Sequence, residues 1–81
     1  MRRRRVTLYT RRECHLCDQA QALLEGLRDE LALDFETVDV DGDAALRERY
    51  GEAVPVIALD GIEIARAPIR ASAVEARLRV R

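Results

Sequence analysis

The chain has 81 residues and a formal net charge of −1, with 48% hydrophobic and 36% charged residues. This composition excludes a disordered segment and predicts one small globular domain over residues 1–81. No overall basic field favours nucleic acid as a partner. Four arginines, Arg2–Arg5, lie at the N-terminus, and we take residues 1–4 as a short basic arm ahead of the first strand. We interpret this arm as a solvated terminus and not as a phosphate- or membrane-binding tail.

The first half of the chain predicts a strand, a long helix and a second strand. Arg5–Thr10 and Asp34–Val40 alternate between apolar and polar residues, as half-buried strands do. Between them, Glu13–Ala32 follows the helical period. Its apolar stripe consists of Leu16, Ala20, Leu23, Leu24, Leu27 and Leu31.

The second half predicts a short helix followed by two more strands. Asp41–Asp43 supplies a turn and a cap for a helix that ends at Tyr50, with Gly51 just beyond its end. Two apolar runs then follow at Val54–Leu59 and Ile62–Ala65. Their length and composition are typical of buried strands.

Turn and cap residues complete the expected fold. Asp60-Gly61 between the last two strands is a hairpin turn pair, and Ser72 with Glu75 fits a capping box for a final helix. Strands separated by a helix pair in parallel, whereas a hairpin adds an antiparallel edge. The sequence therefore predicts an α/β fold with a mixed four-stranded sheet and three helices.

No segment is long and apolar enough to predict a membrane span. Val6–Tyr9 follows the arginines but is too short for the apolar region of a signal peptide, and Arg11 and Arg12 interrupt it. We therefore expect a cytoplasmic protein without a membrane partner.

Cys14 and Cys17 are the only cysteines, and they form a C-x-x-C pair where the first strand gives way to the long helix. Residues three apart on a helix are neighbours, so a small adjustment closes a disulfide between them. A loop this short would stabilise the fold by only about 2 kcal/mol, and cytoplasmic proteins rarely keep structural disulfides. The pair therefore indicates reversible thiol–disulfide exchange.

The helix start gives the two cysteines different expected roles. Free N–H groups, especially those of Leu16 and Cys17, can point at the Cys14 sulfur and favour its thiolate, which makes Cys14 the nucleophile. Cys17 lies one turn inside, where a neutral thiol is favoured, and is the resolving cysteine. His15 is the single histidine; it either modulates the site as a neutral imidazole or is simply an exposed first-turn residue.

The same residues do not predict a metal site. Consecutive side chains point in different directions, and no second C-x-x-C or spaced histidine pair completes a tetrahedral set of ligands. A protease-like dyad of Cys14 and His15 is also disfavoured, because no third group orients the imidazole. We expect no bound metal.

Three stretches extend the pattern beyond the dithiol. Val6–Asp18 contains the cysteines, Val38–Asp41 reads V-D-V-D, and Val54–Ile57 reads V-P-V-I ahead of Asp60-Gly61. Together they resemble the glutaredoxin family of the thioredoxin superfamily, especially its short bacterial glutaredoxin-like proteins with a C-x-L-C-D motif. The resemblance implies a thioredoxin-like fold, βαβαββα, and a redox-active centre that serves cell redox homeostasis and electron transport.

The resemblance also implies roles for single residues. Cys14 matches the family nucleophile and Cys17 the resolving thiol. Arg11 occupies the place of a basic residue that helps to hold the glycine carboxylate of glutathione. Pro55 matches a cis-proline that faces the dithiol, which would present the Val54 backbone to an extended substrate or to the cysteine of glutathione.

Two departures from the family leave the electron donor open. His15 and Leu16 replace a proline and a tyrosine between the cysteines, and Arg66–Ser72 replaces the glycine pair and acidic residue that grip glutathione. Arg66 or Arg70 is then the candidate carboxylate ligand. Electrons are expected to come either from glutathione or from a thioredoxin-reductase-type enzyme.

We therefore expect a monomeric oxidoreductase that reduces disulfide-containing proteins or glutathione-mixed disulfides through Cys14 and Cys17. It holds no cofactor permanently, with glutathione at most a co-substrate. The alternative is an iron–sulfur carrier, in which Cys14 of two chains binds a [2Fe–2S] cluster together with glutathione.

Overall fold

A computed structural model describes residues 3–80 of the chain. The elements follow the expected order, with a single turn of 3-10 helix, η1, after the second strand. Their bounds are β1 Arg4–Thr10, α1 His15–Glu30, β2 Leu33–Asp39, η1 Val40–Gly42, α2 Ala44–Tyr50, β3 Val56–Leu59, β4 Ile62–Arg66 and α3 Ala71–Arg79.

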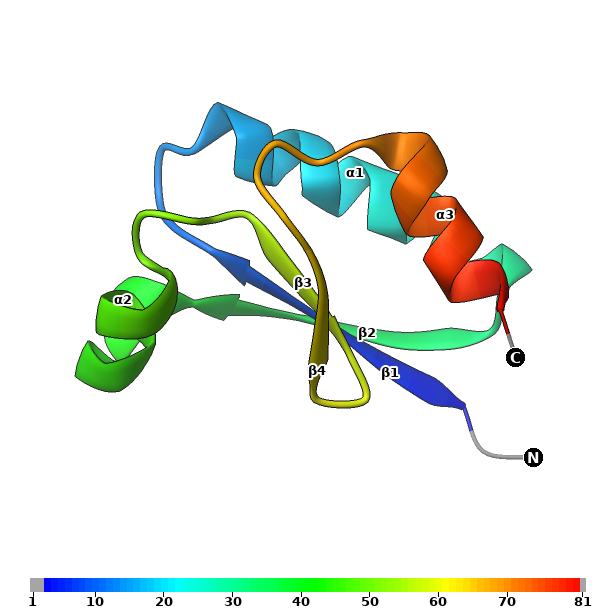
Figure 1. Cartoon of the computed structure of the whole chain (residues 1–81), viewed down its shortest axis with the longest axis horizontal. Coiled ribbons are helices and arrows are strands. Elements are labelled where there is room, and N and C mark those ends of the chain that lie inside the picture. Colours follow the sequence, from blue (N-terminus) through cyan, green and yellow to red (C-terminus); the bar gives the residue numbers. More distant parts are fainter. Residues whose placement is uncertain (1–2, 81) are drawn as a thin grey trace.

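The four strands form one mixed sheet in the order β2-β1-β3-β4. β1 pairs in parallel with β2 and antiparallel with β3, and β3 pairs antiparallel with β4. Figure 1 shows α1 and α3 on one face of this sheet, whereas α2 lies at the end where β1 and β2 finish. The expected α/β fold with a mixed four-stranded sheet and three helices is confirmed.

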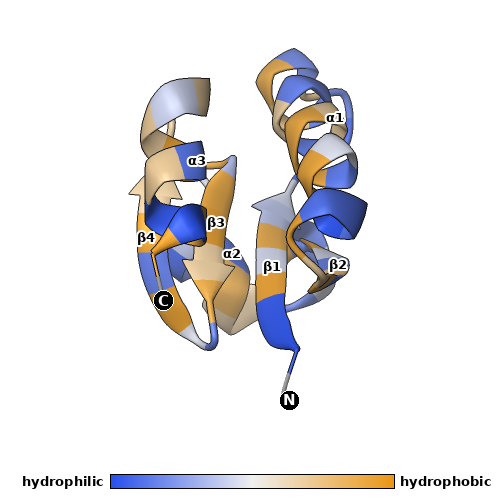
Figure 2. Cartoon of the chain, turned by 90° about the vertical axis from the view of Figure 1, so that its right-hand side faces the viewer, coloured by the Kyte–Doolittle hydropathy of each residue, from blue (hydrophilic) through white to orange (hydrophobic). Residues whose placement is uncertain are grey.

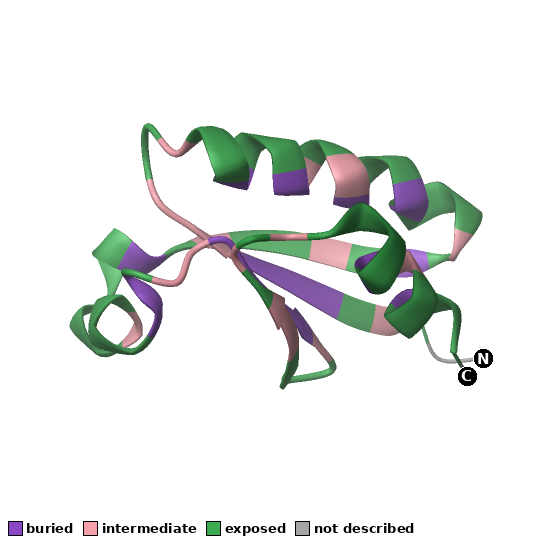
Figure 3. Ribbon diagram, turned by 45° about the horizontal axis from the view of Figure 1, so that its top comes forward, coloured by how far each residue is buried: buried purple, intermediate pink, exposed green. Residues whose placement is uncertain are grey.

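The main core lies between the sheet and the two helices α1 and α3. Figure 2 shows the apolar side of α1 turned toward the interior, and Figure 3 shows the buried positions of that helix along the same side. Each fully buried aliphatic side chain contributes roughly 1.5–3 kcal/mol. The buried residues of this core are Val6, Leu8, Ala20, Leu24, Leu27, Leu33, Ile57, Val74 and Leu78.

Leu16 is the exception in the expected apolar stripe, because 51% of its surface is exposed. The helix begins at His15, so Leu16 lies in the first turn. Cys17, which is 2% exposed, takes the inward position of that turn. Leu16 therefore belongs to the expected apolar stripe by its spacing but is not buried with the rest of it.

A second, smaller cluster attaches α2 to the sheet. Val40, Tyr50 and Val56 are buried there, and Tyr9 packs against them. The rings of Tyr9 and Tyr50 lie 4.6 Å apart with a 30° tilt, a favourable separation for aromatic rings. This cluster fixes the end of the sheet from which the C-x-x-C loop leaves.

The expected start of α2 is confirmed, but Gly51 has a different role from the one expected at the end of that helix. The Asp43 carboxylate accepts hydrogen bonds from the N–H groups of Ala45 and Leu46. Gly51 has right-handed helical backbone angles, so it is not needed for a left-handed turn. It is needed because a Cβ there would clash with the carbonyl oxygen of Arg47.

The capping box expected for the last helix was wrong. α3 begins at Ala71 with Arg70 as its N-cap, and the Arg70 side chain makes no capping hydrogen bond. Ser72 already has a helical backbone, so its hydroxyl cannot fill the cap position.

The expected hairpin turn is confirmed at Asp60 and Gly61. Their φ angles are 50° and 86°, and a two-residue turn with both φ values positive matches the twist of the strands. The Asp60 carboxylate also accepts a hydrogen bond from the Arg5 N–H. The turn is therefore tied to the first strand.

The basic run reaches into the fold. Arg4 is the first residue of β1, and its guanidinium donates to the Val80 carbonyl. Arg3 forms an ion pair with Asp34 at the exposed edge of the sheet. Arg2 lies outside the described residues. No helix within residues 3–80 has the length and apolar character that crossing a membrane requires.

Candidate dithiol active site

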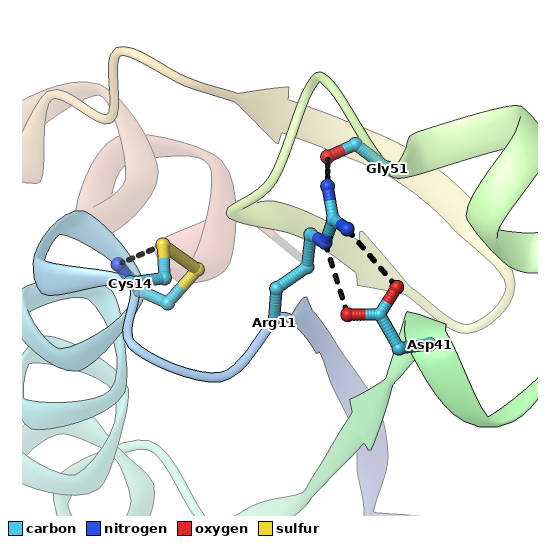
Figure 4. Close-up of a disulfide and its surroundings, with 5 residues drawn as sticks. Arg11, Cys14, Asp41 and Gly51 are labelled. Atoms are coloured by element: carbon cyan, nitrogen blue, oxygen red, sulfur yellow. Dashed lines mark hydrogen bonds and ion pairs between the residues drawn. A yellow bond between two sulfur atoms is a disulfide. The ribbon is translucent and has the colours of Figure 1, made fainter.

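Cys14 occupies the N-cap position of α1, at the end of the loop that leaves β1. Its backbone is extended, and its Sγ accepts a hydrogen bond from the Cys17 N–H at 3.1 Å (Figure 4). Sulfur here takes the place that a capping oxygen usually fills. Of the two amides expected to point at this sulfur, that of Cys17 does so.

Cys14 and Cys17 form a disulfide, with their Cα atoms 5.2 Å apart. The two cysteines differ in access to solvent: Cys14 is half-buried, whereas Cys17 is 2% exposed. An incoming sulfur can therefore approach Cys14 more readily than Cys17. The described structure is the oxidised form of the pair.

Glu13 turns the chain into the active site. Its φ of 53° lies in the left-handed region, which non-glycine residues seldom occupy. Sequence patterns gave no signal for this, because the helical period already included Glu13. The positive φ ends the loop and sets Cys14 at the start of the helix.

Arg11 makes a clasp with Asp41 and Gly51. Its Nε and Nη2 donate to the two Asp41 carboxylate oxygens at 3.1 Å each, and its Nη1 donates to the Gly51 carbonyl at 3.2 Å. We call these three residues the clasp (Figure 4). It joins the loop before Cys14 to η1 and to the loop after α2, and it uses three of the five guanidinium donors.

Pro55 follows a cis peptide bond, as the resemblance implies. It is buried and Val54 is half-buried, and the Val54 N–H donates to the Tyr50 carbonyl at 3.0 Å. Tyr9 pairs with Val56 across β1 and β3. Pro55 therefore lies at the same end of the sheet as the loop that carries Cys14.

The segment after β4 reaches the same end of the sheet. The Ala67 N–H donates to the Ala53 carbonyl at 3.3 Å, and the Ala67–Pro68 peptide is also cis. No sequence signal pointed to this second cis bond. Three loops thus lie at the end of the sheet that carries the dithiol.

The charged and polar candidates around the dithiol are mostly engaged with neighbours. Arg66 donates two hydrogen bonds to Glu63, which hold the pKa of the Glu63 carboxyl below its usual value and raise the pKa of Arg66. Arg70 is exposed at the start of α3. His15 is exposed, with its ring Nε2 3.3 Å from the side-chain nitrogen of Gln19.

The residues of 3–80 include no group of three or more His, Cys, Asp or Glu side chains placed to hold a metal ion. Sequence reasoning placed Asp41 in a turn and gave neither Asp41 nor the Gly51 carbonyl a role in the site. The V-D-V-D stretch that contains Asp41 was the available signal for the clasp.

The family model for the Glutaredoxin-like domain (DUF836) matches residues 5–79. The chain belongs to this family. The uncharacterized protein Rv0508 of Mycobacterium tuberculosis is 40% identical over 68 residues, which cover 78% of this chain and 70% of that protein.

Solved structures share the fold of this chain. The X-ray structure of target protein XcR50 from X. campestris is 43% identical with a TM-score of 0.74, covering 90% of this chain and 93% of that one. Oxidised thioredoxin from Plasmodium falciparum, at 16% identity, has a TM-score of 0.69 and covers 93% of this chain and 77% of that one. The latter shows that the fold is shared.

The chain thus belongs to the glutaredoxin-like family, has a thioredoxin-like fold and carries a redox-type C-x-x-C pair. A dithiol of this kind on this fold supports thiol oxidoreductase chemistry in general.

Proposed function

We propose that the protein is a small cytoplasmic thiol–disulfide oxidoreductase in which Cys14 attacks and Cys17 resolves. The observation that carries this proposal is the contrast between a half-buried Cys14 at the N-cap of α1 and a buried Cys17 beneath it. A cytoplasmic setting, which keeps thiols reduced, suits a dithiol that is recycled. One chain holds both cysteines, so a monomer suffices.

The N-terminal end of α1 favours the Cys14 thiolate. The Cys17 N–H points at the sulfur from 3.1 Å, and the positive end of the helix dipole adds to the stabilisation of an anion. The thiolate is the nucleophilic form of cysteine. His15, exposed beside Cys14, is proposed to modulate this step.

The reaction transfers two electrons in two exchanges. The Cys14 thiolate attacks one sulfur of the substrate disulfide, forms a mixed disulfide and expels the other substrate sulfur as a thiolate. Cys17 then loses its proton and attacks Cys14, which releases the second substrate thiolate and leaves the Cys14–Cys17 disulfide. A reductant, either glutathione or a thioredoxin-reductase-type enzyme, restores the dithiol.

Val54 and Pro55 are proposed to bind the substrate beside the dithiol. An extended segment that approached Cys14 would lie along the end of β3, where the Val54 carbonyl could accept a hydrogen bond from it, since the Val54 N–H already donates to Tyr50. Arg11 is the family position for a glutathione carboxylate. It would use donors that the clasp leaves free.

Reduction of insulin and of a glutathione-mixed disulfide, each with either reducing system, tests the proposal. Wild type should reduce at least one substrate, and Cys14→Ser should reduce neither. Retention of glutathione-linked turnover by Cys17→Ser alone would indicate a monothiol route, whereas loss in both variants indicates a dithiol route. Equal activity of Cys14→Ser and wild type would overturn the proposal. A brown dimer on anaerobic purification would instead favour cluster binding.

A further inference from the structure

An apolar notch lies beside the dithiol, between α1 and the segment that leads into α3. Its volume is about 160 Å³. It is lined by Leu16, Gln19, Ala20, Leu23, Ile69 and Ala71. Leu23 and Ile69 pack against the main core, so the floor of the notch is fixed by the fold.

Leu16 is exposed at the rim of the notch although it lies between the two cysteines. Burying a leucine normally stabilises a protein, and yet 51% of this side chain faces solvent. The oxidoreductase therefore presents apolar surface directly next to its reactive sulfur.

We propose that the notch binds an aliphatic or aromatic side chain of a protein substrate, close in sequence to the cysteine that Cys14 attacks. This inference rests on the proposed function. Leu16 lines the notch and follows Cys14 by two residues, so a side chain next to the cysteine that Cys14 attacks can reach the notch. The binding surface is thus continuous with the reactive site.

The size and polarity of the notch fit such a side chain. An apolar cavity of roughly 150 Å³ accommodates a molecule the size of benzene. No charged residue lines the notch, and its one polar side chain, Gln19, lies beside His15. A charged group placed there would lose water without gaining a partner. The notch consequently favours apolar protein segments over the charged ends of glutathione.

The test uses two disulfide-containing peptides that differ only in the residue beside the reactive cysteine, leucine in one and serine in the other. An open notch buries part of a side chain, so KM should be about tenfold lower for the leucine peptide, with similar kcat. Glutathione disulfide serves as a substrate that has no apolar neighbour.

Two variants should each abolish this preference. Leu16→Ser removes the apolar rim, and Ala71→Leu fills the notch from an exposed position on α3. The matched control is Ile62→Ser, because Ile62 is 69% exposed and does not line the notch. It should keep the preference. Thermal unfolding of each variant verifies that the fold is intact.

The outcomes separate this inference from the proposed function. If wild type reduces both peptides with equal KM, the notch inference is overturned while the oxidoreductase stands. If it reduces neither peptide nor any other disulfide, the proposed function fails. If Leu16→Ser loses the preference for the leucine peptide but Ala71→Leu keeps it, Leu16 changes the reactivity of the dithiol and does not act by lining the notch. A dimer that Leu16→Ser dissociates would show that a second copy occupies the notch; either result contradicts the inference.

Discussion

The two sides of the dithiol differ in what they leave available to a partner. On one side, the clasp of Arg11, Asp41 and Gly51 is polar, and its hydrogen bonds are made within the chain. On the other, the notch around Leu16 is apolar and open to solvent. The polar groups near the dithiol hold the loops together, whereas the apolar surface remains free. Substitutions on the clasp should therefore change stability, and those on the notch should change substrate binding.

The largest effect on the clasp side is expected from Gly51→Ala. The added Cβ would clash with the Arg47 carbonyl oxygen, and relieving such overpacking costs about 1–3 kcal/mol. Urea denaturation should show this loss. In the control Gly26→Ala, the Cβ meets no heavy atom within 4 Å, and the better helix former should stabilise α1 by about 1 kcal/mol. Equal effects of the two changes would disprove the role assigned to Gly51.

Arg11→Ala removes the clasp itself and should cost about 1 kcal/mol of unfolding free energy. The figure is modest because the Arg11 side chain is 40% exposed, so water screens its ion pair with Asp41. A double-mutant cycle with Asp41→Ala measures the coupling directly. Arg12→Ala is the control, since Arg12 is 91% exposed and 3.9 Å from Asp39. A cycle that shows no coupling would mean that the clasp contributes nothing to stability.

The fold and the dithiol could be predicted because their signals are local. Alternating residues in Arg4–Thr10, the positive φ values at Asp60-Gly61 and the cap at Asp43 each depend on a few neighbours in sequence. The helical period that begins at Glu13 places Cys14 within one residue of the observed helix start. These features can therefore be predicted without knowing how the elements pack against one another.

The clasp, the exposure of Leu16 and the start of α3 could not be predicted, because they depend on contacts that sequence patterns do not encode. Arg11 meets Asp41 and Gly51 across 30 and 40 residues, so no spacing rule links them. Leu16 fits the apolar period of α1, but Cys17 takes the inward position of the first turn and Leu16 is exposed. Ser72 matches a capping motif, but α3 starts at Ala71.

On the notch side, Leu16→Ser should leave stability almost unchanged. Its exposed side chain contributes little to the core, so the unfolding free energy should shift by no more than about 0.5 kcal/mol. Chemical denaturation beside the Ile62→Ser control checks this. If Leu16→Ser lost as much unfolding free energy as Gly51→Ala, the clasp and the notch would not differ in their contribution to stability.

The Glu63–Arg66 pair on β4 should give the smallest effect. Because Arg66 lowers the pKa of Glu63 in the folded state, the pair adds stability above the ordinary carboxyl pKa of 4.5 and loses it as the pH falls through the lower, folded-state value. Wild type should therefore exceed Glu63→Gln slightly at neutral pH, and the two should converge in acid. Unfolding curves across pH measure this, and a constant difference would refute it.

The proposed roles of Cys14 as nucleophile and Cys17 as resolving cysteine are tested most directly by trapping the mixed disulfide. Reduced Cys17→Ser, mixed with a disulfide peptide, should accumulate a one-to-one covalent adduct at Cys14, identified by intact mass and peptide mapping. Cys14→Ser should form little adduct, because Cys17 is buried beneath the first turn of α1. An adduct at Cys17 that forms as fast as the one at Cys14 would contradict the account.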